Sequence, residues 1–271
     1  MKSMVIVYSG REGSSAIVSC LGKHSRINVP IFEDLDYGNV KKRFGKAGVD
    51  NIHVALANVL KGNEFNDGVI EPVARKSAES RVVFKWRPFG SIEKICDVFV
   101  DSGTVVAALA RKDFLNYCIS RYYTDVILSE QSAIYHPQFE LMKMSPSQRK
   151  SRIEELRSRS FSVDVESFVE IMQSVIERKV KIQSVTRQMD RNGVVVKHVF
   201  YEDFLQNKRG FLTALLAEMD LEFEEVVTES NFVKVNRSDM RDQVLNIDEL
   251  EADEEIQSLK IEYSALISDL A

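Results

Sequence analysis

The sequence has few cysteines and histidines, and they are not grouped. Of the 271 residues, three are cysteine and four are histidine. Cys20, Cys96 and Cys118 lie far apart among apolar neighbours, so they indicate neither a disulfide framework nor a zinc site, and we expect buried thiols. The histidines show no His-x-x-x-His spacing and no cluster with cysteine. The sequence therefore predicts no metal centre.

Long apolar runs and an excess of positive charge are also missing. No uncharged apolar stretch is long enough for a transmembrane helix, and the first residues lead into a strand-like run instead of a signal peptide. We therefore expect a cytoplasmic protein without a transmembrane segment. The formal net charge of −5 argues against general binding of nucleic acid, so any cationic site must be local. The oligomeric state is left open.

The stretch Met4–Ser19 contains an apolar run of strand type, a glycine-containing turn and a helix start of small residues. Further strand-like runs occur at Arg81–Pro88, Thr104–Ala110 and Val194–Asp203, and helical patterns separate them. This alternation is typical of an α/β protein with an open, mainly parallel sheet flanked by helices. The length allows one such domain with insertions or two small domains, and we expect a single domain over residues 1–271.

The turn has the features of an anion-binding loop. Its glycines allow a sharp bend, and the N–H groups at the start of the following helix point into the turn, where the helix dipole favours negative charge. Arg11, Ser14 and Ser15 add charged and hydroxyl donors. Glu12 is an exception, because its carboxylate must point away from an anion or pair with a cation. A purely structural turn accounts equally well for this stretch alone.

The turn lacks the spacing and the lysine of G-x-x-x-x-G-K-[ST], but it resembles another phosphate loop. The stretch from Gly10 to Ser15, GREGSS, is similar to the S-x-R-S-G-S-T loop of the sulfotransferases, which bind 3′-phosphoadenosine 5′-phosphosulfate (PAPS). It departs from that loop at Glu12 and at Ala16, where many cytosolic members carry a tryptophan that stacks on adenine. The resemblance implies a P-loop NTPase-like sulfotransferase fold with helical insertions. It also implies that the nucleotide is bound by Arg11, Glu12, Gly13, Ser14 and Ser15.

A second motif of the family matches the strand that ends in Lys85-Trp86-Arg87-Pro88. In cytosolic sulfotransferases the comparable strand ends in K-T-H-L-P, where the lysine binds the sulfuryl group and the histidine is the general base. Lys85 matches the lysine, but Arg87 replaces the histidine, and a guanidinium cannot accept a proton at neutral pH. The alternative is a strand whose Lys85 and Arg87 merely face solvent.

The base is therefore sought among the carboxylates that follow the apolar run at 26–32, namely Glu33, Asp34 and Asp36. A solvated turn accounts for these residues equally well. In bacterial sulfotransferases that act on sugar-type acceptors, a glutamate just beyond the second strand is the base. Glu33 is at the matching place, so the resemblance implies that Glu33 is catalytic, together with Lys85 and Arg11.

Two later motifs imply further nucleotide contacts. Arg111 follows the strand-like run at 104–110, and Ser120 comes nine residues later, as in the pair that holds the 3′-phosphate in the family. The tail FVKVNRSDMRDQVLNIDEL is similar to the K-x-N-x-S-D-L tail of bacterial sulfotransferases, and its Lys234, Asn236 and Arg237 would close over the nucleotide.

The resemblance implies transfer of a sulfuryl group from PAPS to an acceptor, with adenosine 3′,5′-bisphosphate as product and no metal. The acceptor is a hydroxyl, or as a second choice an amine, of a carbohydrate, lipid or small metabolite. Residues 121–192 would form a mainly helical insertion on the acceptor side. The alternatives are a nucleotide or small-molecule kinase, which would need magnesium and the missing lysine motif, and a non-catalytic nucleotide-binding member of the same fold.

Overall fold

The computed structural model describes residues 2–30, 35–61, 63–66, 69–72, 79–128, 141, 144–228 and 239–268. The chain forms two compact units. The first comprises Met1–Ala110 and Lys179–Asn231, and the second comprises Arg111–Arg178 and Phe232–Ala271. Compactness does not decide whether the units fold independently, so the single domain expected over residues 1–271 stays a prediction.

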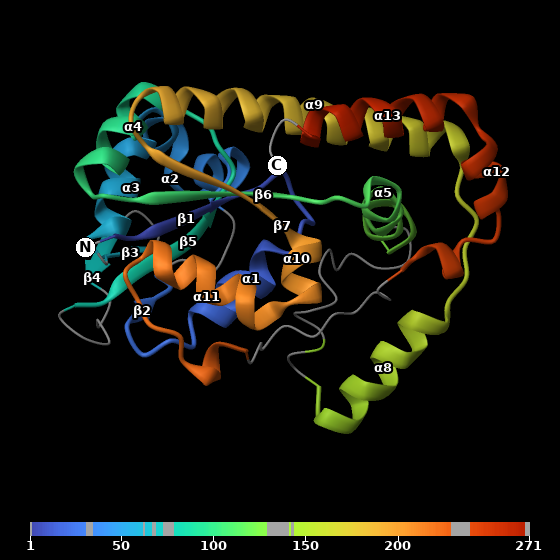
Figure 1. Ribbon diagram of the computed structural model, residues 1–271, viewed down its shortest axis with the longest axis horizontal. Helices are drawn as coiled ribbons and strands as arrows, with labels where there is room; N and C mark the ends of the chain where they lie inside the picture. Colours follow the sequence, from blue (N-terminus) through green and yellow to red (C-terminus); the bar gives the residue numbers. More distant parts are fainter. Residues whose placement is uncertain are drawn as a thin grey trace. The chain divides into compact units, whose positions relative to one another are not determined.

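A five-stranded parallel sheet forms the centre of the first unit (Figure 1). Its strand order is β2-β5-β1-β6-β7, and every pairing is parallel. The strands are β1 (Met4–Val7), β2 (Ile27–Asn28), β5 (Arg81–Trp86), β6 (Val105–Ala110) and β7 (Val195–Phe200). All residues of β1, β5 and β6 are buried, as expected for a parallel sheet covered on both faces. The predicted open, parallel α/β sheet is confirmed. A separate antiparallel pair joins β3 (Asn63–Asn66) to β4 (Val69–Pro72).

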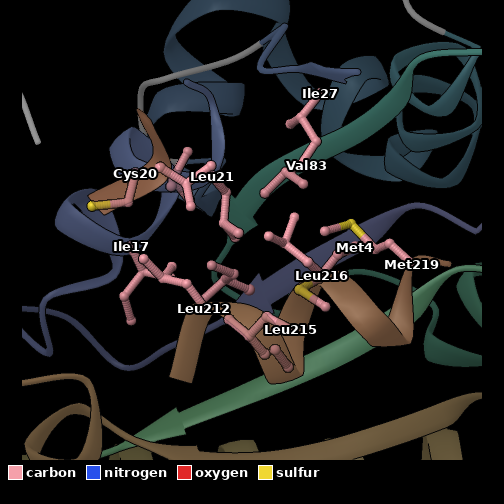
Figure 2. Packing of buried hydrophobic residues seen from close by; sticks show 14 of the residues in the cluster. Met4, Ile17, Cys20, Leu21, Ile27, Val83, Leu212, Leu215, Leu216 and Met219 are labelled. Carbon is pink, nitrogen blue, oxygen red and sulfur yellow. The ribbon is translucent and has the colours of Figure 1, made fainter. Parts of the chain in front are cut away.

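Alternate residues of β1 enter two different cores, because successive side chains of a strand point to opposite faces. Met4 and Ile6 pack with α1 (Ser14–Leu21) and α11 (Lys208–Glu218), and Figure 2 shows Met4 among labelled residues of both helices. Val5 and Val7 pack on the other face. That face is covered by α3 (Ile52–Leu60), α4 (Ile92–Asp101) and the part of α9 (Val165–Arg191) that begins at Lys179. Helices therefore cover both faces of the sheet.

The position of β1 decides where a ligand can bind. From β1 the chain passes through α1 to β2 on one side of the sheet, and it later continues to β6 and β7 on the other side. In open α/β sheets, ligands bind beyond the carboxyl ends of the strands where the direction of the connections changes. The turn between β1 and α1 lies at this place.

The last strand is shorter than the sequence predicts. The run at 194–203 was expected to be a strand as far as Asp203, but β7 ends at Phe200 and Tyr201 begins α10 (Tyr201–Gln206). The apolar pattern does not mark this change, because a buried tyrosine such as Tyr201 suits a strand and a helix start equally well. The remaining elements of the first unit are α2 (Tyr37–Asp50) and a 3₁₀ turn at Glu225–Thr228.

The second unit is helical in its described residues. It contains α5 (Phe114–Tyr122), a π-helical turn (Tyr123–Ile127), α8 (Pro146–Ser158), the part of α9 up to Arg178, a 3₁₀ turn (Arg241–Gln243), α12 (Ile247–Ala252) and α13 (Glu254–Ser268). Three helices begin after capping side chains, since Asp113, Ser145 and Asp164 each accept a backbone N–H of the first turn. The described part of 121–192 is thus mainly helical, whereas its role on the acceptor side stays a prediction.

The three cysteines are buried, and none forms a disulfide, as predicted. Burial raises the pKa of the Cys118 thiol well above its usual value, and burial also raises the pKa of Cys96. Because the thiolate is the reactive form, these shifts make both thiols inert at neutral pH. In the part of the chain that the structure describes, no helix has the length and apolar character needed to cross a bilayer.

Candidate functional site

The turn between β1 and α1 has an unusual backbone. Gly10, Arg11 and Gly13 have φ values of 124°, 58° and 89°. Positive φ is rare for residues other than glycine, so Arg11 adopts a conformation that the surrounding structure must impose. Glu12, between Arg11 and Gly13, does not have positive φ, and turns in which the two kinds of conformation alternate can form an anion-binding concavity of backbone N–H groups.

The N-cap residue of the helix that follows the turn is a glycine, which has no side chain to cap the helix. The cap position of α1 is Gly13, whose carbonyl accepts the N–H groups of Ala16 (3.0 Å) and Ile17 (3.3 Å). The N–H groups before Ala16 have no acceptor within the helix, as at the start of every α-helix. The positive end of the helix dipole lies at the same place. A helix start without a side-chain cap is thus available to an external anion.

Gly13 is also required by a close contact with Tyr201, the first residue of α10. A Cβ atom at position 13 would lie 2.1 Å from Cε2 of the tyrosine ring, well inside van der Waals contact. The ring is 6% exposed and packs in the core beside α1. Tyr201 therefore packs against the turn between β1 and α1, although the two lie far apart in the sequence.

Lys85 lies beside this loop. It is on β5, paired with Ile6 of the neighbouring strand β1, and its Nζ donates a hydrogen bond of 2.7 Å to the Ser15 hydroxyl. The side chain is largely buried, at 7% exposure. The structure thus places Lys85 beside the turn between β1 and α1, while the catalytic role of Lys85 stays a prediction.

Two neighbours of the loop are Tyr8, which the sequence motifs did not single out, and Asp36, one of the carboxylates among which the base was sought. The Arg87 guanidinium lies 5.2 Å from the centre of the Tyr8 ring, and Lys85 Nζ lies 5.8 Å from it. Arg87 also pairs with Asp36 at 3.6 Å, and its guanidinium would be 3.4 Å from a Cβ atom at Gly10. Arg87 therefore faces this loop, and the reading in which it merely faces solvent is wrong.

Glu12 points away from the loop surface, as the sequence requires of a carboxylate in an anion site. It is 0% exposed, and its Oε1 pairs with Nζ of Lys179 at 3.3 Å. Its Oε2 accepts the backbone N–H of Ser9 at 2.6 Å. Lys179 was not among the predicted site residues. Its position in the sequence does indicate burial, because it comes four residues after Val175 and so lies on the apolar face of α9.

Arg111 and Ser120 both belong to the second unit. Arg111 is half-buried, with its guanidinium 5.7 Å from the centre of the Tyr117 ring, and its carbonyl accepts the Tyr263 hydroxyl at 2.9 Å. Ser120 is half-buried on α5, where its carbonyl accepts the Thr124 hydroxyl. Joint binding of a 3′-phosphate by these two residues stays a prediction.

The start of α5 is fixed by charged contacts. Asp113 Oδ1 accepts the N–H of Asn116 at 3.2 Å and a guanidinium nitrogen of Arg241 at 2.5 Å. Burial by itself would lower the pKa of Arg241, but the carboxylates of Asp113 and Asp239 outweigh it and the net shift of the pKa is upward. Arg241 therefore stays charged at neutral pH, and its ion pair with Asp113 holds the start of the helix that carries Ser120.

Four residues of the sequence-based site, Glu33, Lys234, Asn236 and Arg237, lie outside the described residues. Within the residues that the structure does describe, no three or more His, Cys, Asp or Glu side chains are grouped so as to hold a metal ion. The expectation that no metal is needed stays a prediction.

No family model and no curated protein matches this chain. Among solved structures, it is similar to the sulfotransferase domain of the Synechococcus PCC 7002 olefin synthase, with 14% identity, a TM-score of 0.45, and coverage of 99% of this chain and 94% of the other. It is similar to the sulfotransferase domain of the curacin biosynthetic pathway, with 12% identity, a TM-score of 0.46, and coverage of 99% and 97%. A sulfotransferase from Alicyclobacillus acidocaldarius has 13% identity, a TM-score of 0.43, and coverage of 100% and 96%.

All three neighbours are sulfotransferases or sulfotransferase domains, the family that the sequence motifs resemble. The identities are low and the TM-scores are below 0.5. An activity for this chain must therefore be argued from its own residues.

The contact between Gly13 and Tyr201 gives a first prediction. We expect Gly13→Ala to lower the free energy of unfolding by clearly more than about 1 kcal/mol, because the added methyl group meets the ring at a position that also has positive φ. Urea unfolding measures the change. The matched control is Gly103→Ala, where φ is +62° but the nearest atom is 4.0 Å from the added Cβ. Equal losses in the two variants would contradict the proposed steric role of Tyr201.

Proposed function

We propose that this protein is a sulfotransferase that moves a sulfuryl group from PAPS to a hydroxyl group of a carbohydrate, lipid or small-metabolite acceptor, with an amine as the second choice. One observation carries the proposal. Lys85 Nζ donates to the Ser15 hydroxyl beside the left-handed glycine turn. A lysine, a serine hydroxyl and a helix start with glycine at its N-cap thus converge at the carboxyl end of β1, where open α/β sheets generally bind their ligands.

The residues of the first unit fit the phosphosulfate end of the nucleotide. Gly13 lets the Tyr201 ring pack directly against the turn, and Glu12 takes no part in repelling an anion because its carboxylate is turned to the interior. Ser14, Ser15 and Arg11 would add donors. Glu12 would belong to the site through its backbone only.

The far end of the nucleotide would be held by other residues. Arg111 and Ser120 would bind the 3′-phosphate, since an arginine fork and a hydroxyl suit an anion with three acceptor oxygens. Lys234, Asn236 and Arg237 would close over the nucleotide. These assignments come from the motifs of the sequence.

PAPS supplies a sulfuryl group bonded to a phosphate, which is a good leaving group. Lys85 and Arg11 would stabilise the negative charge that grows on the oxygens during transfer, and preorganised donors of this kind are worth about 3–4 kcal/mol each. Glu33 would accept the proton of the acceptor hydroxyl as that oxygen attacks the sulfur. Arg87 cannot replace it, because its guanidinium stays protonated and is paired with Asp36.

Ligand-induced stabilisation distinguishes sulfuryl transfer from the activity of a kinase. We expect adenosine 3′,5′-bisphosphate without magnesium to raise the melting temperature, because a ligand at about 100 times its Kd adds about 2.7 kcal/mol to the stability. A thermal-shift assay with and without EDTA measures the effect. Stabilisation by ATP and magnesium only would contradict the proposal and favour a kinase.

The role of Lys85 can be tested in a transfer assay with labelled PAPS and a panel of acceptors. We expect Lys85→Met to lower kcat by about 10²- to 10³-fold, with a smaller effect on binding of adenosine 3′,5′-bisphosphate, because the lost charge acts mainly in the transition state. The matched control is Lys94→Met on α4, where the lysine is exposed. A protein that binds the nucleotide but transfers sulfate to no acceptor would instead be a non-catalytic member of this fold.

Glu33→Gln tests the assignment of the base. The amide keeps the size of the side chain but cannot accept a proton, so we expect kcat to fall by about 10²- to 10⁴-fold and nucleotide binding to be retained. The pH dependence of kcat should lose its acidic limb as well. If the variant transfers labelled sulfate at the rate of the unmodified protein, another group is the base.

A further inference from the structure

The ion pair of Glu12 and Lys179 is almost completely buried. Glu12 is 0% exposed and Lys179 is 2% exposed. Lysine and glutamate are seldom fully buried, because their charges lose hydration that a single partner only partly replaces. Apolar side chains of similar volume often stabilise a protein as much as a buried ion pair does, or more. The stability of the fold therefore gives no sufficient account of this pair.

The contacts of the pair connect three elements of the first unit. Lys179 Nζ lies 3.3 Å from Glu12 Oε1 and donates to the Leu109 carbonyl, near the end of β6, at 2.5 Å. Glu12 Oε2 accepts the N–H of Ser9 at 2.6 Å. Both carboxylate oxygens are thus engaged beneath the turn that contains the positive-φ residues Arg11 and Gly13.

The electrostatic effect of the pair follows from where it lies. An unpaired carboxylate in this turn would repel any anion that approached the N–H groups of the turn, and the repulsion would be strong because little water separates the charges. A lysine ammonium beside that carboxylate makes the pair neutral. The side chain of Glu12 is also held in the interior, so that it does not compete for the same N–H groups.

We propose that Lys179 is a positioning residue: by holding and neutralising Glu12, it enables the anion-binding turn to accept the 5′-phosphosulfate end of the nucleotide. Lys179 acts through Glu12 and does not touch the substrate. This inference rests on the proposed function for the identity of the anion, but the effect of Lys179 on the turn does not depend on it.

The test compares two nucleotides that differ only in the position of the phosphate, measured by isothermal titration. For Lys179→Met we expect the affinity for adenosine 5′-phosphate to fall about tenfold, and the affinity for adenosine 3′-phosphate to change less than about threefold. Adding Glu12→Gln to Lys179→Met removes the uncompensated charge, so the double variant should recover to within about threefold of the original affinity for the 5′-phosphate. Lys181→Met, an exposed lysine on the same helix, is the control and should bind as the original protein does.

A second measurement needs no ligand. Hydrogen exchange of the peptide covering residues 9–15, followed by mass spectrometry, should be faster in Lys179→Met than in the original protein, because the Ser9 N–H loses a fixed acceptor. If Lys179→Met does not fold, Glu12→Asp replaces it in the test, because the shorter side chain keeps the carboxylate charge but moves it away from Lys179 Nζ. The same faster exchange and the same selective loss of 5′-phosphate affinity are then expected.

Two outcomes would overturn the inference. One is a folded Lys179→Met variant with unchanged affinity for the 5′-phosphate and unchanged exchange at residues 9–15. The other is an equal loss of affinity for both nucleotides, which indicates general destabilisation. If the original protein binds neither nucleotide, the proposed function fails, and the exchange measurement alone decides the role of Lys179.

Discussion

The parallel pairing of β1 with β5 on one side and β6 on the other is the constraint on which the candidate site depends. It brings the carboxyl ends of three buried strands to one edge of the sheet. Lys85 from β5, the turn after β1 and the Leu109 carbonyl of β6 are close together for this reason. If β5 were not the neighbour of β1, Lys85, which is 70 residues from Ser15 in the sequence, would not reach its hydroxyl.

Opposite charges near the turn occur in pairs of different kinds. Glu12 and Lys179 are buried and neutralise each other, whereas Arg87 and Asp36 are partly exposed. Lys85 is bound to a neutral hydroxyl, so it contributes a positive charge that no carboxylate in that contact cancels. A chain with a formal net charge of −5 can thus have a locally positive surface without being basic overall.

Much of the fold could be predicted from the sequence, because buried parallel strands appear as short apolar runs between helical segments. The runs that contain β1, β5 and β6 were recognised in this way, and Asp113 and Ser145 marked helix starts through local capping chemistry. The predicted end of β7 was wrong, because a buried tyrosine suits a strand and a helix start equally well.

The site was only partly predictable. The glycine turn and Lys85 have local patterns, and the requirement for a partner of Glu12 followed from charge alone. Its identity did not, because Lys179 is 167 residues away and only tertiary packing selects one lysine among many. The role of Tyr201 was hidden for the same reason, since nothing near Gly13 in the sequence indicates which ring will cover it.

The packing of Tyr201 against Gly13 has a consequence for how the protein is made. The turn at residues 10–13 is completed by the side chains of Lys179 and Tyr201, which are added to the growing chain much later. Contacts of such large sequence separation close long loops, whose ordering entropy must be met before the contacts form. A nascent chain that ends before Lys179 therefore lacks both contacts that complete the turn.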